Sequence, residues 1–155
     1  MIEYYACDTA NEAFIGLITC LDAELIKRYG AAQAAYQPHN VIDSGEAIIA
    51  SENGFHVGCG CFRPYDEDTV EIKRMYVRPE YRGRGVAREL LIRLESCAKK
   101  KGYRSAVLET GRGQPEAIRL YEKSGYVRIP NYASYADMPE SICFKKGLEK
   151  TDEAF

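Results

Sequence analysis

The chain has 155 residues, 46% of them hydrophobic, and a formal net charge of −2 at pH 7. This length and composition suit one globular domain of ordinary size and exclude a chain that is disordered throughout. No apolar run approaches the roughly 20 residues of a membrane-spanning helix, and residues 1–8 lack the basic and apolar regions of a secretory signal. We therefore expect a cytoplasmic protein without a membrane partner.

Apolar spacing and turn residues predict strands that alternate with helices. In chain order the expected elements are a strand at 2–6, two helices or one broken helix within 11–35, a loop at 37–45, strands at 47–51, 56–62 and 70–77, a helix at 85–101, a strand at 105–110, a helix at 115–124, and strands at 126–129 and 141–145. This order predicts an α+β fold with a mixed, mostly antiparallel sheet, one parallel strand pairing and flanking helices. We expect a single domain over residues 1–148 and a polar tail over residues 149–155.

The six cysteines are scattered along the chain, which favours reduced thiols over a disulfide framework. Cys59 and Cys61 would lie on one face of a strand, a spacing that is compatible with a metal site. No C-x-x-C pair accompanies them, and His39 and His56 have no ligand spacing to each other. We therefore expect packed thiols and no metal.

Positive charge is concentrated in one stretch of the chain. Residues 73–104 hold eleven Lys/Arg and three Asp/Glu, a local net charge of +8, so the rest of the chain carries −10. A basic block in an acidic chain favours a polyanionic ligand that is held at one place. Nucleic acid is the alternative ligand, but the chain as a whole is acidic, so we expect no nucleic-acid partner.

A glycine-rich turn lies inside this basic block. The expected strand at 70–77 leads through Pro79 into Arg82-Gly83-Arg84-Gly85, and a helical pattern opens directly afterwards. Such an arrangement cradles a pyrophosphate, because backbone N–H groups and the positive end of the helix dipole face the anion. The alternative is a tight strand–helix turn with solvated arginines. The turn favours a site for a nucleotide-type cofactor.

The segment Arg82–Ala87 resembles the Q/R-x-x-G-x-G/A signature of the GNAT superfamily of N-acetyltransferases, with alanine in the sixth place. The later segment Gln114–Tyr126 resembles the next landmark of that family, and the likeness covers residues 47–129 well. The resemblance implies a GNAT-like fold in which the parallel strands at 71–77 and 105–110 splay apart around the cofactor. It also implies acetyl-CoA as the acetyl-donor cosubstrate and makes a homodimer an expectation.

The same resemblance implies which residues hold acetyl-CoA. Backbone N–H groups of the turn would carry the diphosphate, the Arg82 side chain would close over it, and backbone groups of the preceding strand would bind the pantetheine amides. Gln114 stands where the family commonly has asparagine. The implied cofactor-binding residues are Met75, Val77, Arg82, Gly83, Arg84, Gly85, Val86, Ala87 and Gln114.

Catalytic roles follow from the family's positions. Glu71 matches the general base that takes a proton from the amine, and Tyr121 matches the general acid that protonates the departing thiolate. The N–H group of Met75 would polarise the thioester carbonyl. The alternatives are a Glu71 carboxylate that is paired with Lys73 or an arginine, and a Tyr121 ring that is simply packed beneath the sheet.

The acceptor is expected to be a small-molecule amine or a peptide amine. Its candidate contacts, from the first helices, the sheet and the loop before the last strand, are Tyr29, Tyr36, His39, Arg74, Glu109, Asn131, Tyr132 and Tyr135. Arg74 in the site would favour an anionic acceptor such as an amino acid, whereas Glu109 would favour a polyamine or a lysine side chain. The alternative for the tyrosines is ordinary packing.

The chain is therefore expected to be an N-acetyltransferase that works by direct attack in a ternary complex. A coenzyme A-binding sensor or interaction domain without turnover is the first alternative. A nucleotide-binding protein is the second, although the turn lacks the Gly-Lys-Ser/Thr ending of a phosphate-binding P-loop.

Overall fold

The computed structural model describes residues 1–36 and 45–148. Residues 37–44 of the expected loop, with the candidate His39, and the expected tail at 149–155 lie outside the described residues. By packing, the chain divides into two compact units, which we call the first unit (residues 1–63 and 73–94) and the second unit (residues 64–72 and the chain from 95 onward). The expectation of a single domain over residues 1–148 stays a prediction.

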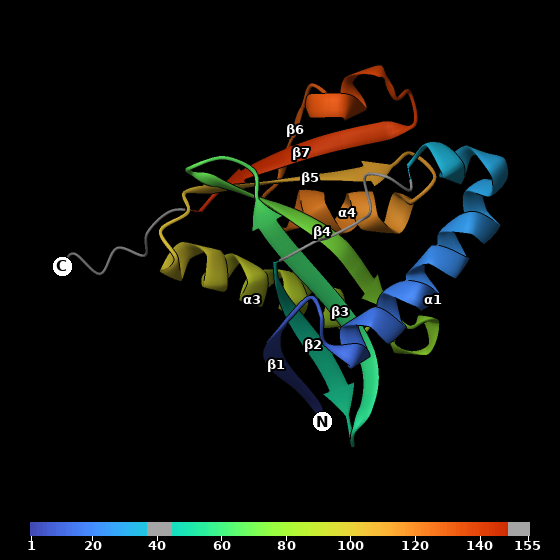
Figure 1. Cartoon of the computed structure of the whole chain (residues 1–155), viewed down its shortest axis with the longest axis vertical. Coiled ribbons are helices and arrows are strands. Elements are labelled where there is room, and N and C mark those ends of the chain that lie inside the picture. Colours follow the sequence, from blue (N-terminus) through green and yellow to red (C-terminus); the bar gives the residue numbers. More distant parts are fainter. Residues whose placement is uncertain (37–44, 149–155) are drawn as a thin grey trace. The chain divides into compact units, whose positions relative to one another are not determined.

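The first unit contains three antiparallel strands, β1 (Ile2–Asp8), β2 (Glu46–Glu52) and β3 (Phe55–Pro64), which lie side by side in Figure 1. The hairpin between β2 and β3 turns through Asn53 and Gly54, whose φ angles are 51° and 82°. These left-handed conformations are those that a tight hairpin requires, so the expected Asn-Gly turn is confirmed.

A helix with a break follows β1, as expected. Its first part, α1 (Glu12–Tyr29), begins at Asn11, whose side chain accepts a 2.8 Å hydrogen bond from the N–H of Ala13. It ends at Gly30, and the chain continues as the short 3₁₀ helix η1 (Gly30–Ala35). One face of α1 packs on the sheet in a core made of Phe14, Leu17, Leu21, Ala47, Ile49, Cys59, Cys61 and Tyr76. Burial of each large apolar side chain in this core contributes about 1.5–3 kcal/mol relative to exposure.

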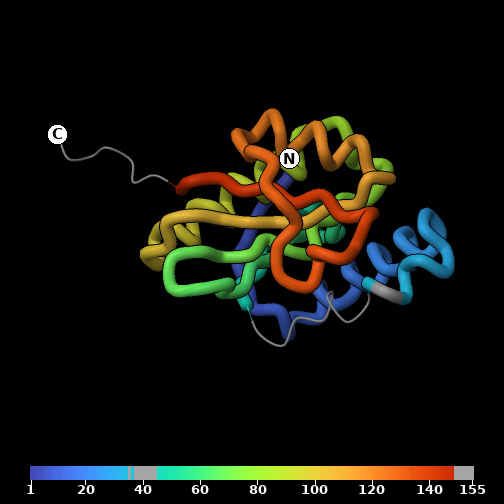
Figure 2. The backbone as a smooth tube through the Cα atoms, turned by 90° about the horizontal axis from the view of Figure 1, so that it is seen from above, coloured from blue at the N-terminus to red at the C-terminus, as the bar shows by residue number. Residues whose placement is uncertain are grey.

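The second unit is built on β5 (Ser105–Gly111), which the first half of β4 (Thr69–Val77) joins in parallel, from Thr69↔Ser105 to Ile72↔Leu108. On its other side β5 pairs antiparallel with β7 (Ser141–Gly147), and Figure 2 traces these two strands beside each other. The edge strand β6 (Val127–Ile129) pairs antiparallel with β7. The expected parallel pairing is therefore confirmed.

Two helices belong wholly or partly to the second unit. The helix α4 (Pro115–Lys123) begins with proline in its first turn. The helix α3 (Val86–Lys100) starts in the first unit and continues into the second. There Glu95 accepts two 2.9 Å hydrogen bonds, from the Tyr126 hydroxyl and from the Lys146 ammonium. This buried network ties the second half of α3 to β7.

The hydrogen-bonded strand order of the sheet is β1-β2-β3-β4-β5-β7-β6. The α+β fold class with a mostly antiparallel sheet, one parallel pair and flanking helices is therefore confirmed. Sequence patterns missed two short 3₁₀ helices, η2 (Pro79–Tyr81) and η3 (Ala133–Asp137), because one turn is too short to show a helical period.

The described cysteines are free thiols. Cys59 and Cys61 are buried, and their sulfurs donate to the carbonyl oxygens of Arg74 and Lys73, at 3.6 and 3.3 Å. Within residues 1–36 and 45–148, no group of three His, Cys, Asp or Glu side chains could hold a metal ion. In the same part of the chain, no helix has the length and apolar character needed to cross a bilayer.

Candidate active site

The strand β4 carries candidate residues of both units. Glu71 lies in the part that belongs to the second unit, and Arg74, Met75 and Val77 lie in the part that belongs to the first. Within the continuous strand lies Arg74, a buried residue whose φ angle is 59°. A non-glycine residue in this conformation inside a strand is uncommon, and it breaks the regular alternation of side chains.

In the first unit, β4 leads through η2 into the glycine turn and then into α3, as the sequence indicates. Gly83 and Gly85 have φ angles of 81° and 80°. A Cβ atom built on either glycine would meet nothing within 4 Å. Glycine is therefore required by the backbone conformation and not by crowding, and the space above the turn is open.

The turn presents the N-terminus of α3. The first N–H groups of an α-helix have no partner within the helix, and the helix dipole adds positive potential at the same end. Val86, the first helical residue, is 2% exposed and fixes this end against the core. The start of α3 is thus a rigid set of donors with the chemistry to bind an anion.

The arginines of the turn are held by neighbours in the first unit. Arg82 donates through Nε to the carbonyl oxygen of Val77 at 2.8 Å and through Nη2 to Glu24 Oε1 at 2.7 Å. Arg84 is exposed and stacks over the Tyr81 ring, with its guanidinium carbon 4.8 Å from the ring centre. The Arg82 guanidinium therefore braces the end of β4, while the half-exposed Arg84 side chain reaches β2, where its Nη1 atom lies 3.9 Å from Glu52 Oε1.

The Met75 side chain, half-buried, lies against Gly60 of β3. A Cβ atom at Gly60 would overlap the Met75 sulfur and would come within 2.9 Å of a methyl carbon of Leu94. The absence of a side chain at residue 60 therefore allows Met75 to pack where it does.

The Arg74 side chain is directed to α1 and not to solvent. Its Nη2 atom lies 2.5 Å from Asp22 Oδ1 and 3.3 Å from the carbonyl oxygen of Ile18. The side chain is 3% exposed, and its Nε atom has no hydrogen-bond partner among the described residues. If Arg74 is to bind a charged acceptor, as the sequence predicts, that acceptor would have to compete with Asp22 for the guanidinium.

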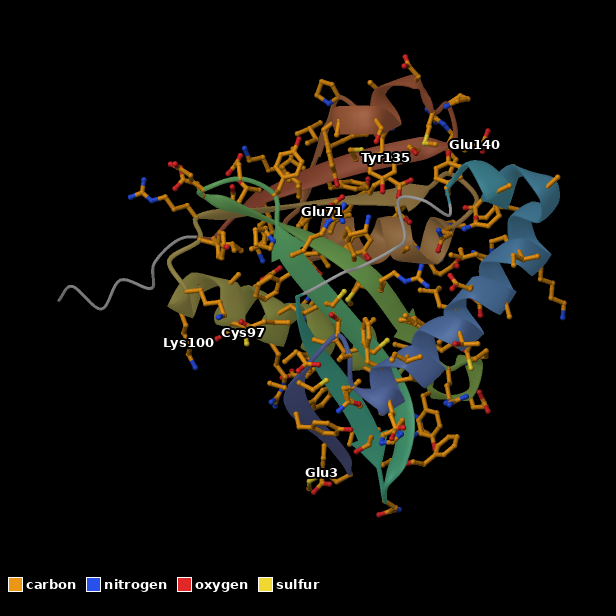
Figure 3. All side chains as sticks on the ribbon, viewed as in Figure 1. Glu3, Glu71, Cys97, Lys100, Tyr135 and Glu140 are labelled. Atoms are coloured by element: carbon orange, nitrogen blue, oxygen red, sulfur yellow. The ribbon has the colours of Figure 1, made fainter. Side chains whose placement is uncertain are left out.

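In the second unit, Glu71 is buried, with 3% of its surface exposed, and accepts a 2.7 Å hydrogen bond from the Tyr132 hydroxyl through Oε2. Figure 3 labels Glu71 on β4 and Tyr135 on η3, two members of this region. Burial, the Glu71 charge and the hydrogen bond raise the pKa of Tyr132, so its hydroxyl keeps its proton and acts as a donor. The structure thus brings together two predicted site residues that are 61 positions apart.

Strand register places Glu109 on the same sheet face as Glu71. Glu71 is opposite Val107 of β5, and side chains two residues apart on a strand share a face. Cys143 of β7 is opposite Glu109 and lies on this face too. Glu109 accepts a 2.8 Å hydrogen bond from the Ser141 hydroxyl.

Burial raises the pKa of Cys143 to about 11; a backbone hydrogen bond from Tyr132 opposes the rise, and Glu109 and Glu71 add to it.

Tyr121 lies on the other face of this sheet. Its ring packs against Tyr126 and Phe144, at centroid distances of 5.8 and 6.2 Å, and Phe144 is opposite Leu108, not Glu109. Burial, and to a smaller extent the Glu109 charge, raise the pKa of Tyr121. Gln114, expected two helical turns away on the face of Tyr121, is the residue that precedes α4 and caps it through its backbone carbonyl.

Of the remaining acceptor candidates, Asn131 stabilises the loop before β7 through its side-chain hydrogen bonds. Its side-chain amide donates to the carbonyl oxygens of Tyr135, Met138 and Ser141, at 3.0 to 3.2 Å. Tyr65, which sequence reasoning missed, packs edge-on against Tyr132 with a centroid distance of 5.3 Å. No local pattern indicates such a contact, because Tyr65 lies in the loop between β3 and β4 and Tyr132 in the loop before β7.

Comparisons with known proteins place the chain in a family. Residues 8–126 match the acetyltransferase (GNAT) family. An IAA acetyltransferase of Azospirillum brasilense is 36% identical over 102 residues, which cover 65% of this chain and 67% of that protein.

Two solved structures extend the comparison. The structure of a Klebsiella pneumoniae protein assigned as an acyl-CoA N-acyltransferase matches with a TM-score of 0.81 and 31% identity, over 96% of this chain and 99% of that one. A GNAT acetyltransferase from Elizabethkingia anophelis, solved with acetyl-CoA bound, shares the fold with a TM-score of 0.67 at 20% identity, over 94% of this chain and 97% of that one. The chain belongs to the acetyltransferase (GNAT) family and is an acyltransferase.

Proposed function

We propose that the protein transfers an acetyl group from acetyl-CoA to a primary amine by direct attack in a ternary complex. Glu71 acts as the general base, Tyr121 as the general acid, and the Met75 N–H as the donor to the thioester carbonyl. The observation that carries the proposal is the buried Glu71 carboxylate on the strand that leads into the glycine turn and α3.

The glycine turn has the properties that a diphosphate needs. Its two left-handed glycines leave open space, and α3 offers free N–H donors at the same place. We propose that residues 82–87 hold the diphosphate of acetyl-CoA and that Met75 and Val77 bind the pantetheine arm through backbone groups. Gln114 is the further proposed contact. Acetyl-CoA supplies the acetyl group as an activated thioester.

Glu71 is proposed to accept a proton from the amine, directly or through water, so that the nitrogen lone pair can attack the carbonyl carbon. A new C–N bond forms, and the carbon–sulfur bond breaks with its electrons on sulfur. The Met75 N–H stabilises the negative charge that develops on the carbonyl oxygen. Tyr121, whose phenol is protonated at neutral pH, is proposed to donate its proton to the departing thiolate.

The acceptor is proposed to be a small-molecule or peptide amine. The residues proposed to select it are Tyr132, Glu109 and Arg74. Assembly as a homodimer and a cytoplasmic location are further proposals. Size-exclusion chromatography with light scattering would measure the oligomeric state.

The test is thiol release from acetyl-CoA against a panel of amino acids, polyamines, aminoglycosides and short peptides. We expect Glu71→Gln to lower kcat about 10²- to 10⁴-fold, and Tyr121→Phe to lower it less, since general acid–base groups contribute on this scale. Glu122→Gln, which changes an exposed carboxylate of α4, is the matched control and should keep the wild-type rate.

Two results would contradict the proposal in different ways. Acetyl transfer that neither Glu71→Gln nor Tyr121→Phe slows would show that the roles are wrong. A silent panel, together with calorimetric binding of coenzyme A, would favour a sensor or interaction domain.

A further inference from the structure

The Tyr132 hydroxyl donates a hydrogen bond to the Glu71 carboxylate, with 2.7 Å between the two oxygens. Hydrogen bonds of this length to an ionised acceptor are short and about twice as strong as those between neutral groups. Glu71 lies on a strand, but its carboxylate can still turn about its side-chain bonds. A fixed donor at Oε2 restricts that rotation.

Tyr132 is itself fixed by its neighbours in the second unit. Its ring is held edge-on by two other tyrosines, Tyr65 at 5.3 Å and Tyr135 at 5.5 Å, with interplanar angles of 76° and 87°. The Tyr135 ring is 4% exposed, so one of the two supports is itself a core residue.

The loop that carries Tyr132 is shaped by polar contacts within the same unit. The Asn131 amide, one residue earlier, gathers the three carbonyl oxygens of Tyr135, Met138 and Ser141. Arg112 donates to the far end of the loop, from its Nε to the carbonyl oxygen of Pro139 at 2.7 Å. The loop therefore presents the Tyr132 hydroxyl to Glu71 from a braced backbone.

We infer that Tyr132 is a positioning residue, which holds the Glu71 carboxylate in the orientation from which it takes the proton of the amine. This inference rests on the proposed role of Glu71 as the base. It gives Tyr132 a role other than selection of the acceptor, because its hydroxyl donates to Glu71. It also makes the loop before β7 part of the catalytic apparatus through Asn131.

The test is a double-mutant cycle with acetyl-CoA and the panel amine of highest kcat/KM. Tyr132→Phe keeps the ring and its packing but removes the donor, and we expect kcat to fall about ten- to a hundredfold, since small displacements of a catalytic group have effects of this size. The KM values for acetyl-CoA and for the amine should stay within about twofold of the wild-type values. In the Glu71→Gln background, Tyr132→Phe should lower kcat no further.

Two matched variants accompany the cycle. Tyr5→Phe removes a hydroxyl from an exposed ring of β1, outside the site, and should keep the wild-type kcat. Asn131→Ala should lower kcat in the same direction as Tyr132→Phe, and should likewise have no further effect in the Glu71→Gln background. The thermal unfolding midpoint of each variant is measured to check that the variant is folded at the assay temperature.

The outcomes separate the inference from the function on which it rests. If Tyr132→Phe raises the KM for the amine, or lowers kcat equally in the wild-type and Glu71→Gln backgrounds, Tyr132 acts on the acceptor and the inference alone is overturned. If Glu71→Gln has full activity, or if no amine is acetylated, the role of Glu71 fails and the inference fails with it.

Discussion

Arg82 is bound to Val77 by a hydrogen bond of 2.8 Å from Nε to the carbonyl oxygen, across the turn that joins β4 to α3. The same guanidinium reaches Glu24 of α1 with Nη2. One side chain of the glycine turn therefore links the end of a strand, a helix and the turn itself. The shape of the proposed diphosphate site depends on Arg82 even before any ligand is bound.

Arg82→Ala should raise the KM for acetyl-CoA about tenfold or more, because it removes a charge-assisted bond to the backbone, generally about 1.5–3 kcal/mol, together with a cation beside the diphosphate. Steady-state kinetics and calorimetry with coenzyme A measure the effect. Arg93→Ala removes the same charge from an exposed position of α3 and should leave the KM unchanged. Equal KM values for the two variants would contradict the assignment of Arg82.

Gly83→Ala and Gly85→Ala should each destabilise the fold by about 1 kcal/mol, because an L residue is strained at φ near 80° even where space is open. Both should also weaken binding of coenzyme A. Urea denaturation gives the stability change. Gly16→Ala in α1 is the opposite control: its Cβ also meets nothing within 4 Å, the residue is helical, and alanine there should stabilise by about 0.5–1 kcal/mol.

Asp22→Ala should cost about 2 kcal/mol of unfolding free energy, because it leaves the buried Arg74 guanidinium with an uncompensated charge. The cost stays below that of a fully buried pair, since Asp22 is 46% exposed. Asp22→Asn keeps an acceptor oxygen and should lose about half as much. A pair of variants as stable as the wild type in urea denaturation would show that water replaces Asp22 without loss.

Alkaline pH should weaken the fold partly through Cys143. Burial raises the pKa of this thiol from its ordinary value of 9.0 to about 11, so unfolding releases a proton between these values. The stability contribution is therefore complete below pH 9 and is lost as the pH rises to 11. Two pKa units correspond to about 2.7 kcal/mol. The difference in unfolding free energy between the wild type and Cys143→Ala should fall by about this amount from pH 8 to pH 11. A constant difference would contradict the raised pKa.

Local chemistry explains why the glycine turn and the element order could be predicted. Asn53-Gly54, Gly83 and Gly85 have left-handed backbones, which glycine and asparagine signal directly in a sequence. The parallel pairing of β4 with β5 followed from an apolar run in β5. The roles of the cofactor-binding and catalytic residues stay predictions.

The rest of the site depends on contacts that have no sequence period. Tyr132 meets Glu71 across 61 residues, and Arg74 meets Asp22 across 52. Both contacts join a strand residue to a partner whose position depends on how a loop or helix packs. Such partners can be named as polar or aromatic candidates, but tertiary packing alone decides which of them touch.

Residue 74 is subject to two demands that no single amino acid meets. Its backbone conformation, with φ at 59°, is the one that glycine adopts most easily, whereas its buried ion pair with Asp22 needs a long cation. Glycine would relieve the backbone and lose the pair, and lysine would keep a charge without relieving the backbone or restoring the planar fork of donors. In a saturation library at this position, every substitution should therefore lower the stability of the protein. Residue 74 should also change more slowly in evolution than the positions of β4 that face the apolar core.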